Sequence, residues 1–231
     1  MVRTIRARLA LTPQALRQTT AYYLLFVGLG VSSAIIGPTL PLLAAQTHSS
    51  LGAMGFLFLA SSSGSLLGTL IGGRLYDRLS GHPVLAAAQV ASALLLVEVP
   101  LVPRLWLLAA VLAAKGLADG MVNAGANTLL TWTHGERVGP FMNGLHFCFG
   151  LGAFLSPLLV AQTARLGIPY AWAFWGLAAF NLLAGLRMLV LRGRPVPLPR
   201  PAQAGAVPIR SDAARIAAGA LFLFFYVGSE I

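Results

Sequence analysis

The chain has few charged residues. Only 10% of its 231 residues are charged and 57% are hydrophobic, whereas an ordinary soluble protein carries about a quarter charged residues. Such a sequence has too little polar surface to coat a soluble particle. Its one cysteine, Cys148, excludes an intramolecular disulfide framework, and no Cys/His cluster has the spacing of a zinc site. We therefore expect a protein of the lipid bilayer without a bound metal.

The formal net charge of +10 comes from basic residues in short gaps between apolar runs. No continuous basic patch or nucleic-acid-binding motif accompanies it, so we expect no nucleic-acid partner. Positively charged loops stay cytoplasmic. Arginines cluster before the first apolar run, after the second and fourth, and around the end of the sixth, whereas only Arg104 and Arg165 fall on the other side. The N-terminus is thus expected in the cytoplasm, in a plasma membrane, with a bacterial inner membrane as the preferred case.

Six apolar runs have about the length that crosses a bilayer, on the order of 20 residues. Because no water satisfies backbone groups in the bilayer core, each run must be a helix. The sequence predicts an all-α membrane protein, a six-helix transmembrane bundle within residues 1–191. Pro38 and Pro41 should bend its first helix. The helices are expected at 21–45, 51–73, 83–103, 105–133, 140–163 and 169–191.

Residues 192–212 form a basic, proline-rich stretch that predicts an extended cytoplasmic linker. A seventh apolar run at 213–231 ends before a helix would finish crossing, and we interpret it as the truncated start of a seventh transmembrane helix. RLSG at 78–81, after the second helix, recurs as RLG at 165–167, after the fifth. This repetition indicates a 3+3 inverted repeat.

Polar residues inside the spans mark a candidate site, because each ionisable group there costs about 2.5–3.5 kcal/mol on insertion. Lys115, Asp119, Asn123 and Asn127 recur every four residues and lie on one slowly drifting stripe of the fourth helix. Lys115 and Asp119 can pair within that helix. The two amides each offer two donors and two acceptor sites, which suits sugar hydroxyls. Interhelical hydrogen bonding is the structural alternative for both asparagines.

Two further positions carry candidate chemistry. Asn143 and His146 share one face near the start of the fifth helix, and a histidine there can carry or gate a proton. A neutral packing histidine is the alternative. Glu230, in the seventh run, has no cation near it in the sequence and joins Asp119 as a candidate ion-coupling group.

Small residues crowd the second apolar run, where Gly64, Gly68 and Gly72 recur every four residues. This spacing lets helix backbones approach closely, so helix packing is the predicted role. An intramembrane hydrolase built on a serine, His146 or Cys148 is disfavoured, because no nucleophile and base stand at a suitable spacing. We expect a protein that is not an enzyme.

The segment GGRLYDRLSGHP, between the second and third helices, resembles the major facilitator signature of glycine, three residues, aspartate and a basic residue. Gly73, Asp77 and Arg78 match those positions. The resemblance implies that these residues act in gating, by latching the cytoplasmic ends of helices from opposite halves. His82-Pro83 stands where a basic pair is usual, which implies an altered latch.

Four segments resemble helices 1, 4, 5 and 7 of the fucose-permease and sodium-dependent glucose transporter-like branch of that superfamily. They are GPTLPLLAAQTHSSL, DGMVNAGANTLL, MNGLHFCFGLGAFLSP and YVGSEI, in chain order. The resemblance implies the amino-terminal half of a major facilitator fold, partnered by the carboxy-terminal half of the same transporter.

Residue by residue, Asn127 and Asn143 match asparagines of the fucose-permease pattern, and His146 stands where a glutamine is common. Asn123 falls at an acidic position of that pattern and Gly37 at its helix 1 aspartate. Both acids are missing here, so proton symport by that route is not implied. Sodium coupling, facilitated diffusion and coupling through another carboxylate stay open.

These features together predict a secondary transporter that binds a small polar solute, of which a hexose is the favoured example, and exposes it alternately to each side of the membrane. No cofactor is expected beyond a coupling proton or sodium ion. The alternative is a non-transporting scaffold or receptor, in which the polar stripe only holds the bundle together. The predicted residues are Asn123, Asn127, Asn143 and His146 for substrate binding, Asp119 and Glu230 for ion coupling, and Gly73, Asp77 and Arg78 for gating.

Overall fold

The computed structural model describes residues 12–191, and no strand occurs among them. The all-α prediction is therefore confirmed for this part of the chain. The predicted linker at 192–212 and the predicted seventh helix at 213–231, with Glu230, lie outside the described residues. The elements are α2 (Pro13–Ala34), α3 (Ile36–Gln46), α4 (Leu51–Arg78), α5 (Gly81–Glu98), η1 (Val99–Leu101), α6 (Leu105–His134), η2 (Gly135–Arg137), α7 (Val138–Arg165) and α8 (Ala171–Val190).

Helix ends follow capping chemistry more closely than they follow the ends of the apolar runs. α2 begins at Pro13, well before the predicted start at 21, because the Thr12 hydroxyl accepts a hydrogen bond from the Ala15 amide at 3.1 Å. Proline is also well tolerated at the first helical position. α4 continues past its predicted end at 73 to Arg78, whose positive charge complements the dipole of the last turn.

The first span is bent, as the prolines predict. α2 and α3 meet at an angle of 45°. Pro38 has no N–H to donate to the carbonyl of Ala34, four residues earlier, and α2 ends at that residue. Because the helix is broken here, the last carbonyl groups of α2 have no hydrogen-bond partner within the helix.

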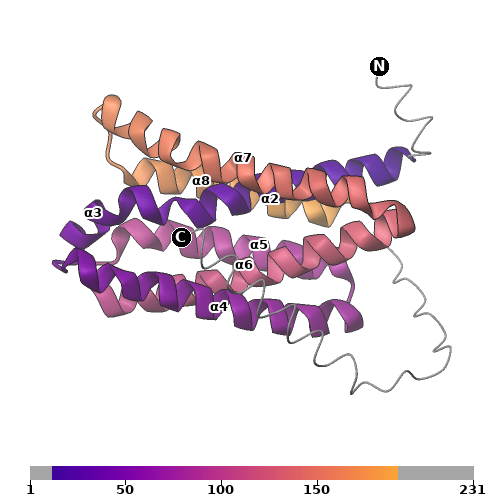
Figure 1. The fold of residues 1–231 in the computed structure, drawn as a ribbon, viewed down its shortest axis with the longest axis horizontal. Coiled ribbons are helices and arrows are strands. Elements are labelled where there is room, and N and C mark those ends of the chain that lie inside the picture. Colours follow the sequence, from indigo (N-terminus) through magenta and orange to yellow (C-terminus); the bar gives the residue numbers. More distant parts are fainter. Residues whose placement is uncertain (1–11, 192–231) are drawn as a thin grey trace. The chain divides into compact units, whose positions relative to one another are not determined.

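Length and hydropathy identify four stretches able to cross a membrane among the described residues, or five if the bent pair α2 and α3 counts as one. One of these stretches, Leu105–Arg165, has 61 residues and contains both α6 and α7. An unbroken helix of that length would measure about 90 Å, three times the hydrocarbon thickness of a bilayer. The chain instead turns back at η2, and α7 returns along the bundle (Figure 1).

Glycines let α4 and α6 pack with their backbones in contact. A Cβ atom added at Gly64 or Gly68 would lie 2.0 or 1.9 Å from a backbone oxygen of α6, and one added at Gly116 or Gly120 would lie 2.1 Å from a backbone oxygen of α4. The packing role predicted for the glycines of α4 is thereby confirmed.

The same arrangement joins α2 to α7, which lie side by side in Figure 1. A Cβ atom at Gly30 would lie 2.1 Å from the Phe149 carbonyl oxygen, and one at Gly152 would lie 2.1 Å from the Val27 carbonyl oxygen. α5 packs against α8 as the third close pair.

At the end of the bundle where α3 finishes, the Gln46 side chain hydrogen-bonds to the segment around η1 and to the residue before α8. Its amide nitrogen donates to the Val102 carbonyl at 2.5 Å and to the Val99 carbonyl at 3.3 Å, and its oxygen accepts from the Tyr170 hydroxyl. A tyrosine hydroxyl is protonated at neutral pH and can donate this bond, and burial raises the pKa of Tyr170 further.

Two apolar clusters fill the bundle and leave a thin polar layer between them. On α5, α6 and α8 the two clusters are separated by buried polar residues near the middle of each helix. Ser32, Ser92, Lys115, Asp119 and Asn181 are linked to one another in this layer, and Gln89 is also buried between the clusters on α5. A polar layer at this depth of an apolar bundle is where a site is expected.

Candidate functional site

An ion pair lies at the centre of the polar layer. The Lys115 Nζ is 2.6 Å from Asp119 Oδ2, one helical turn away on α6, so the predicted pairing is confirmed. Both residues are buried. The Ser92 hydroxyl donates to the other carboxylate oxygen of Asp119 at 2.5 Å. Because both carboxylate oxygens have donors, the charge of Asp119 is held in one orientation.

α2 and α8 complete the layer. The Lys115 ammonium lies 3.5 Å from the Ser32 carbonyl oxygen, and the Asn181 amide nitrogen donates to the Ser32 hydroxyl at 3.1 Å. The Asn181 carbonyl oxygen is buried without a hydrogen-bond partner. Five polar side chains from four helices thus meet in the middle of an apolar bundle.

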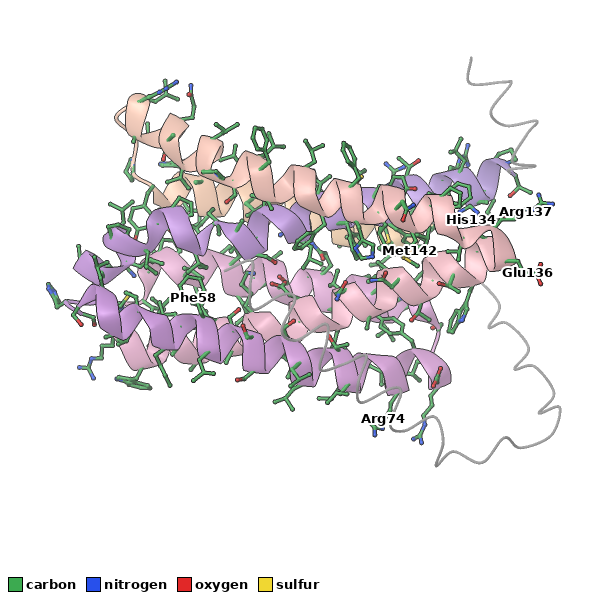
Figure 2. The ribbon with its side chains drawn as sticks, viewed as in Figure 1. Phe58, Arg74, His134, Glu136, Arg137 and Met142 are labelled. Carbon is green, nitrogen blue, oxygen red and sulfur yellow. The ribbon has the colours of Figure 1, made fainter. Side chains whose placement is uncertain are left out.

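Two cavities open on the polar layer. One has a volume of about 300 Å³ and is lined by Asn123 and His146 among others. The second has a volume of about 210 Å³ and is lined by Lys115 and by Phe58, which Figure 2 labels on α4. The residues common to both linings are Ser33, Ser65 and Asp119. The Asp119 carboxylate therefore stands where the two cavities adjoin.

A third and larger cavity, of about 460 Å³, lies between α2, α7 and α8. Its lining is almost wholly aliphatic and aromatic, from Val27 and Leu155 to Phe180. Gln162 and Thr163 add only a few hydrogen-bonding groups to this lining, and polar solutes need several such groups, so the two smaller cavities are the better candidates for a polar ligand.

The cavity linings include two of the four predicted substrate-binding residues. Asn123 on α6 and His146 on α7 line the same 300 Å³ cavity, and the His146 ring lies edge-on to Phe26, with ring centroids 5.9 Å apart. Asn127 lines neither cavity. Its amide nitrogen donates to the Asn123 backbone oxygen at 2.8 Å and to the side-chain oxygen at 3.0 Å. Asn127 thus orients Asn123, and its own contact with solute stays a prediction.

Asn143 is exposed and lines neither of these two cavities, so its contact with solute stays a prediction. The gating residues Gly73, Asp77 and Arg78 lie exposed at the end of α4. Within residues 12–191 the ion pair of Lys115 and Asp119 is formed, whereas Asp77 and Arg78 make no ion pair there. Their gating role also stays a prediction.

Sequence reasoning missed Ser92 and Asn181. Each sits near the middle of an apolar run, and that central depth is the signal that could have marked them. It also treated His82 only as a departure from a basic pair. The structure buries His82, where its Nε2 shares a hydrogen bond of 2.7 Å with the Tyr22 hydroxyl.

Ser92→Ala tests how firmly Asp119 is held. The substitution leaves one buried carboxylate oxygen without its donor, so we expect the free energy of unfolding to fall by about 1.5–3 kcal/mol. Chemical denaturation in detergent micelles, followed by circular dichroism, measures the change. Ser63→Ala is the matched control, since Ser63 is exposed and should cost less than about 0.5 kcal/mol. Equal effects of the two variants would contradict the assigned hydrogen bond.

Comparison with known proteins gives consistent matches. The family model described as Major Facilitator Superfamily matches residues 22–229. The mouse protein named sodium-dependent glucose transporter 1A is 30% identical over an alignment of 244 positions, which covers 90% of this chain and 57% of that protein. The human sodium-dependent glucose transporter 1 is 29% identical, over 89% of this chain and 46% of that protein.

Human major facilitator superfamily domain-containing protein 4A is 34% identical over 146 residues, which cover 62% of this chain and 28% of that protein. The chain spans about half the length of the curated relatives it matches over most of its own length.

Proposed function

Because the chain belongs to the major facilitator superfamily, we propose that it forms one half of a secondary transporter that moves a small polar solute of the sugar class by alternating access. The chain is a member of a transporter family and not an enzyme. The observation that carries the proposal is the 300 Å³ cavity, which Asn123, His146 and Asp119 line together.

The chemistry of this cavity suits a polyhydroxyl solute. Ser33, Ser65 and the Asn123 amide supply both donors and acceptors, while Phe26 and Phe149 supply flat apolar surface. Ligand sites combine a few placed polar groups with aromatic walls in this way. The names of the mouse and human relatives, which specify glucose transport, support the sugar class.

We propose six membrane crossings arranged as a 3+3 inverted repeat. The packing pattern supports this arrangement. If the bent pair α2 and α3 is the first crossing, α2 with α7 joins crossings one and five, and α4 with α6 joins two and four. In such a repeat, crossings one, two and three correspond to crossings four, five and six. Exchanging the two halves therefore converts the pair of crossings one and five into the pair of crossings four and two. Both pairs also pack through reciprocal glycine contacts.

We place the N-terminus in the cytoplasm of a cell with this protein in its plasma membrane. Figure 2 shows Arg74 and Arg137 near one end of the bundle, and α2 begins at that same end in Figure 1. Positive charge gathered at one end favours the cytoplasmic side.

The proposed partner is a carboxy-terminal half that closes the cavity from its open side. Major facilitator transporters hold their substrate near the midplane between two halves, and the chain covers about half of its longer relatives. In this arrangement Asn123 and His146 contact the solute, and Asn127 positions Asn123. Asn143 is proposed as a further contact at the same face. Asp119 and Glu230 are the proposed ion-coupling groups, and Gly73, Asp77 and Arg78 the gating residues.

Asn123→Ala tests the proposal. The variant removes hydrogen bonds to the solute worth about 1–2 kcal/mol, so we expect uptake to fall about tenfold at subsaturating solute. The measurement is sugar uptake into proteoliposomes that contain the chain together with a carboxy-terminal half. Folded yield should persist, because Asn123 is only half-buried.

Thr128→Ala is the matched control, on the same helix but outside both cavity linings, and should keep normal uptake. A loss of folded yield in Asn123→Ala would indicate a scaffold role. The transporter proposal fails if the parent protein neither takes up a sugar nor is thermally stabilised by one.

A further inference from the structure

Lys115 is the only lysine of the chain, and its side chain is 4% exposed in the middle of α6. Placing a charged ammonium group at this depth of a membrane protein costs free energy, and an apolar side chain would not carry that cost. Helix packing alone does not require a charge here. The role of the charge is therefore sought in the groups that surround the ammonium.

The ammonium has oxygen partners of two kinds. One is the Asp119 carboxylate at 2.6 Å, and the other is the Ser32 backbone carbonyl at 3.5 Å. Ser32 lies in the last turn of α2, which ends at Ala34 where the first span bends. The carbonyls of a last turn carry the negative end of the helix dipole and attract cations. In broken membrane helices such ends coordinate sodium ions or protons.

The oxygen groups are held by contacts that do not involve the ammonium. Ser92 donates to Asp119 Oδ1 at 2.5 Å, and the Asn181 amide donates to the Ser32 hydroxyl at 3.1 Å. Removing the lysine side chain would therefore leave Asp119 and Ser32 anchored. The 210 Å³ cavity that Lys115 and Asp119 line offers water and small ions a route to them.

We propose that Asp119 and the carbonyl end of α2 form a monovalent-cation site whose resident cation is the Lys115 ammonium. The chain binds no inorganic cation at this position while Lys115 is present. Replacing Lys115 with a small uncharged residue converts the position into a sodium site. The consequence for transport rests on the proposed function: any ion coupling through Asp119 then uses a proton and not sodium, although several relatives are named as sodium-dependent.

Lys115→Ala tests the site without any transport assay. Thermal unfolding of the purified full chain in detergent is measured in sodium chloride and in choline chloride at equal ionic strength. We expect no difference for the parent chain. For Lys115→Ala, sodium should raise the midpoint with a saturating dependence, by about 5–10 °C at 100 times its Kd.

Lys115→Ala/Asp119→Asn is the control, and it should show no response to sodium. The proposal is overturned if Lys115→Ala gains no sodium response, if it does not fold even in sodium chloride, or if the double variant responds equally. It is also overturned if the parent chain is stabilised by sodium and Asp119→Asn abolishes that effect. None of these outcomes depends on uptake, so a failure of the transporter proposal would remain distinguishable.

Discussion

Replacing Asp119 with alanine is expected to lower the free energy of unfolding by about 3–5 kcal/mol, because it leaves a buried ammonium without its counter-charge. Lys115 lies 2.6 Å from Asp119 in the parent chain and is nearly inaccessible. The variant also removes the acceptor of the Ser92 hydroxyl. Denaturant titration in micelles, with helicity as the signal, measures the loss.

A double variant separates the charge effect from packing. Lys115→Met/Asp119→Leu replaces the pair with uncharged side chains of similar size, and such replacements of buried ion pairs are commonly neutral or stabilising. We expect the double variant to recover most of the stability lost in Asp119→Ala. If it is as unstable as the single variant, the loss comes from packing and not from an unpaired charge.

The features that the sequence predicts correctly are those set by local spacing. A run of about 20 apolar residues specifies a helix wherever it packs, and four-residue spacing brings Lys115 and Asp119 together within α6. Pro38 acts on the helix that contains it, so the bend of the first span could also be predicted.

Contacts between helices could not be predicted, because helical periodicity tells which residues share a face but not which helix lies opposite. The Ser92 hydroxyl reaches Asp119 from α5, and Asn181 reaches Ser32 from α8. Neither pair has a local sequence signal that links its members.

The polar stripe of α6 is predicted to drift slowly around the helix, and its residues divide between roles. Four-residue steps advance about 40° around a helix with 3.6 residues per turn, so three steps from Lys115 to Asn127 turn the side chain by about 120°. Asp119 and Asn123 consequently reach the 300 Å³ cavity, whereas Asn127 hydrogen-bonds Asn123.

The walls of the site depend on the close approach of α4 and α6. Ser65 on α4 and Asp119 on α6 both line the two cavities, and Gly68 and Gly120 bring the two backbones into contact beside them. A side chain placed between the helices would therefore change the site as well as the packing.

Gly68→Leu is expected to destabilise the chain by about 3 kcal/mol or more, at or above the upper end of ordinary overpacking effects. Its Cβ would lie 1.9 Å from the Leu117 carbonyl oxygen, and only separation of the helices relieves that clash because the backbone cannot turn aside. Gly55→Leu, on the same helix with no atom within 4 Å of the added Cβ, should change stability little. Thermal unfolding in detergent compares the two variants, and equal midpoints would contradict the close packing of α4 on α6.

Because the same separation moves Ser65 away from Asp119, Gly68→Leu should lower stability and solute uptake together, whereas Asn123→Ala should lower uptake alone.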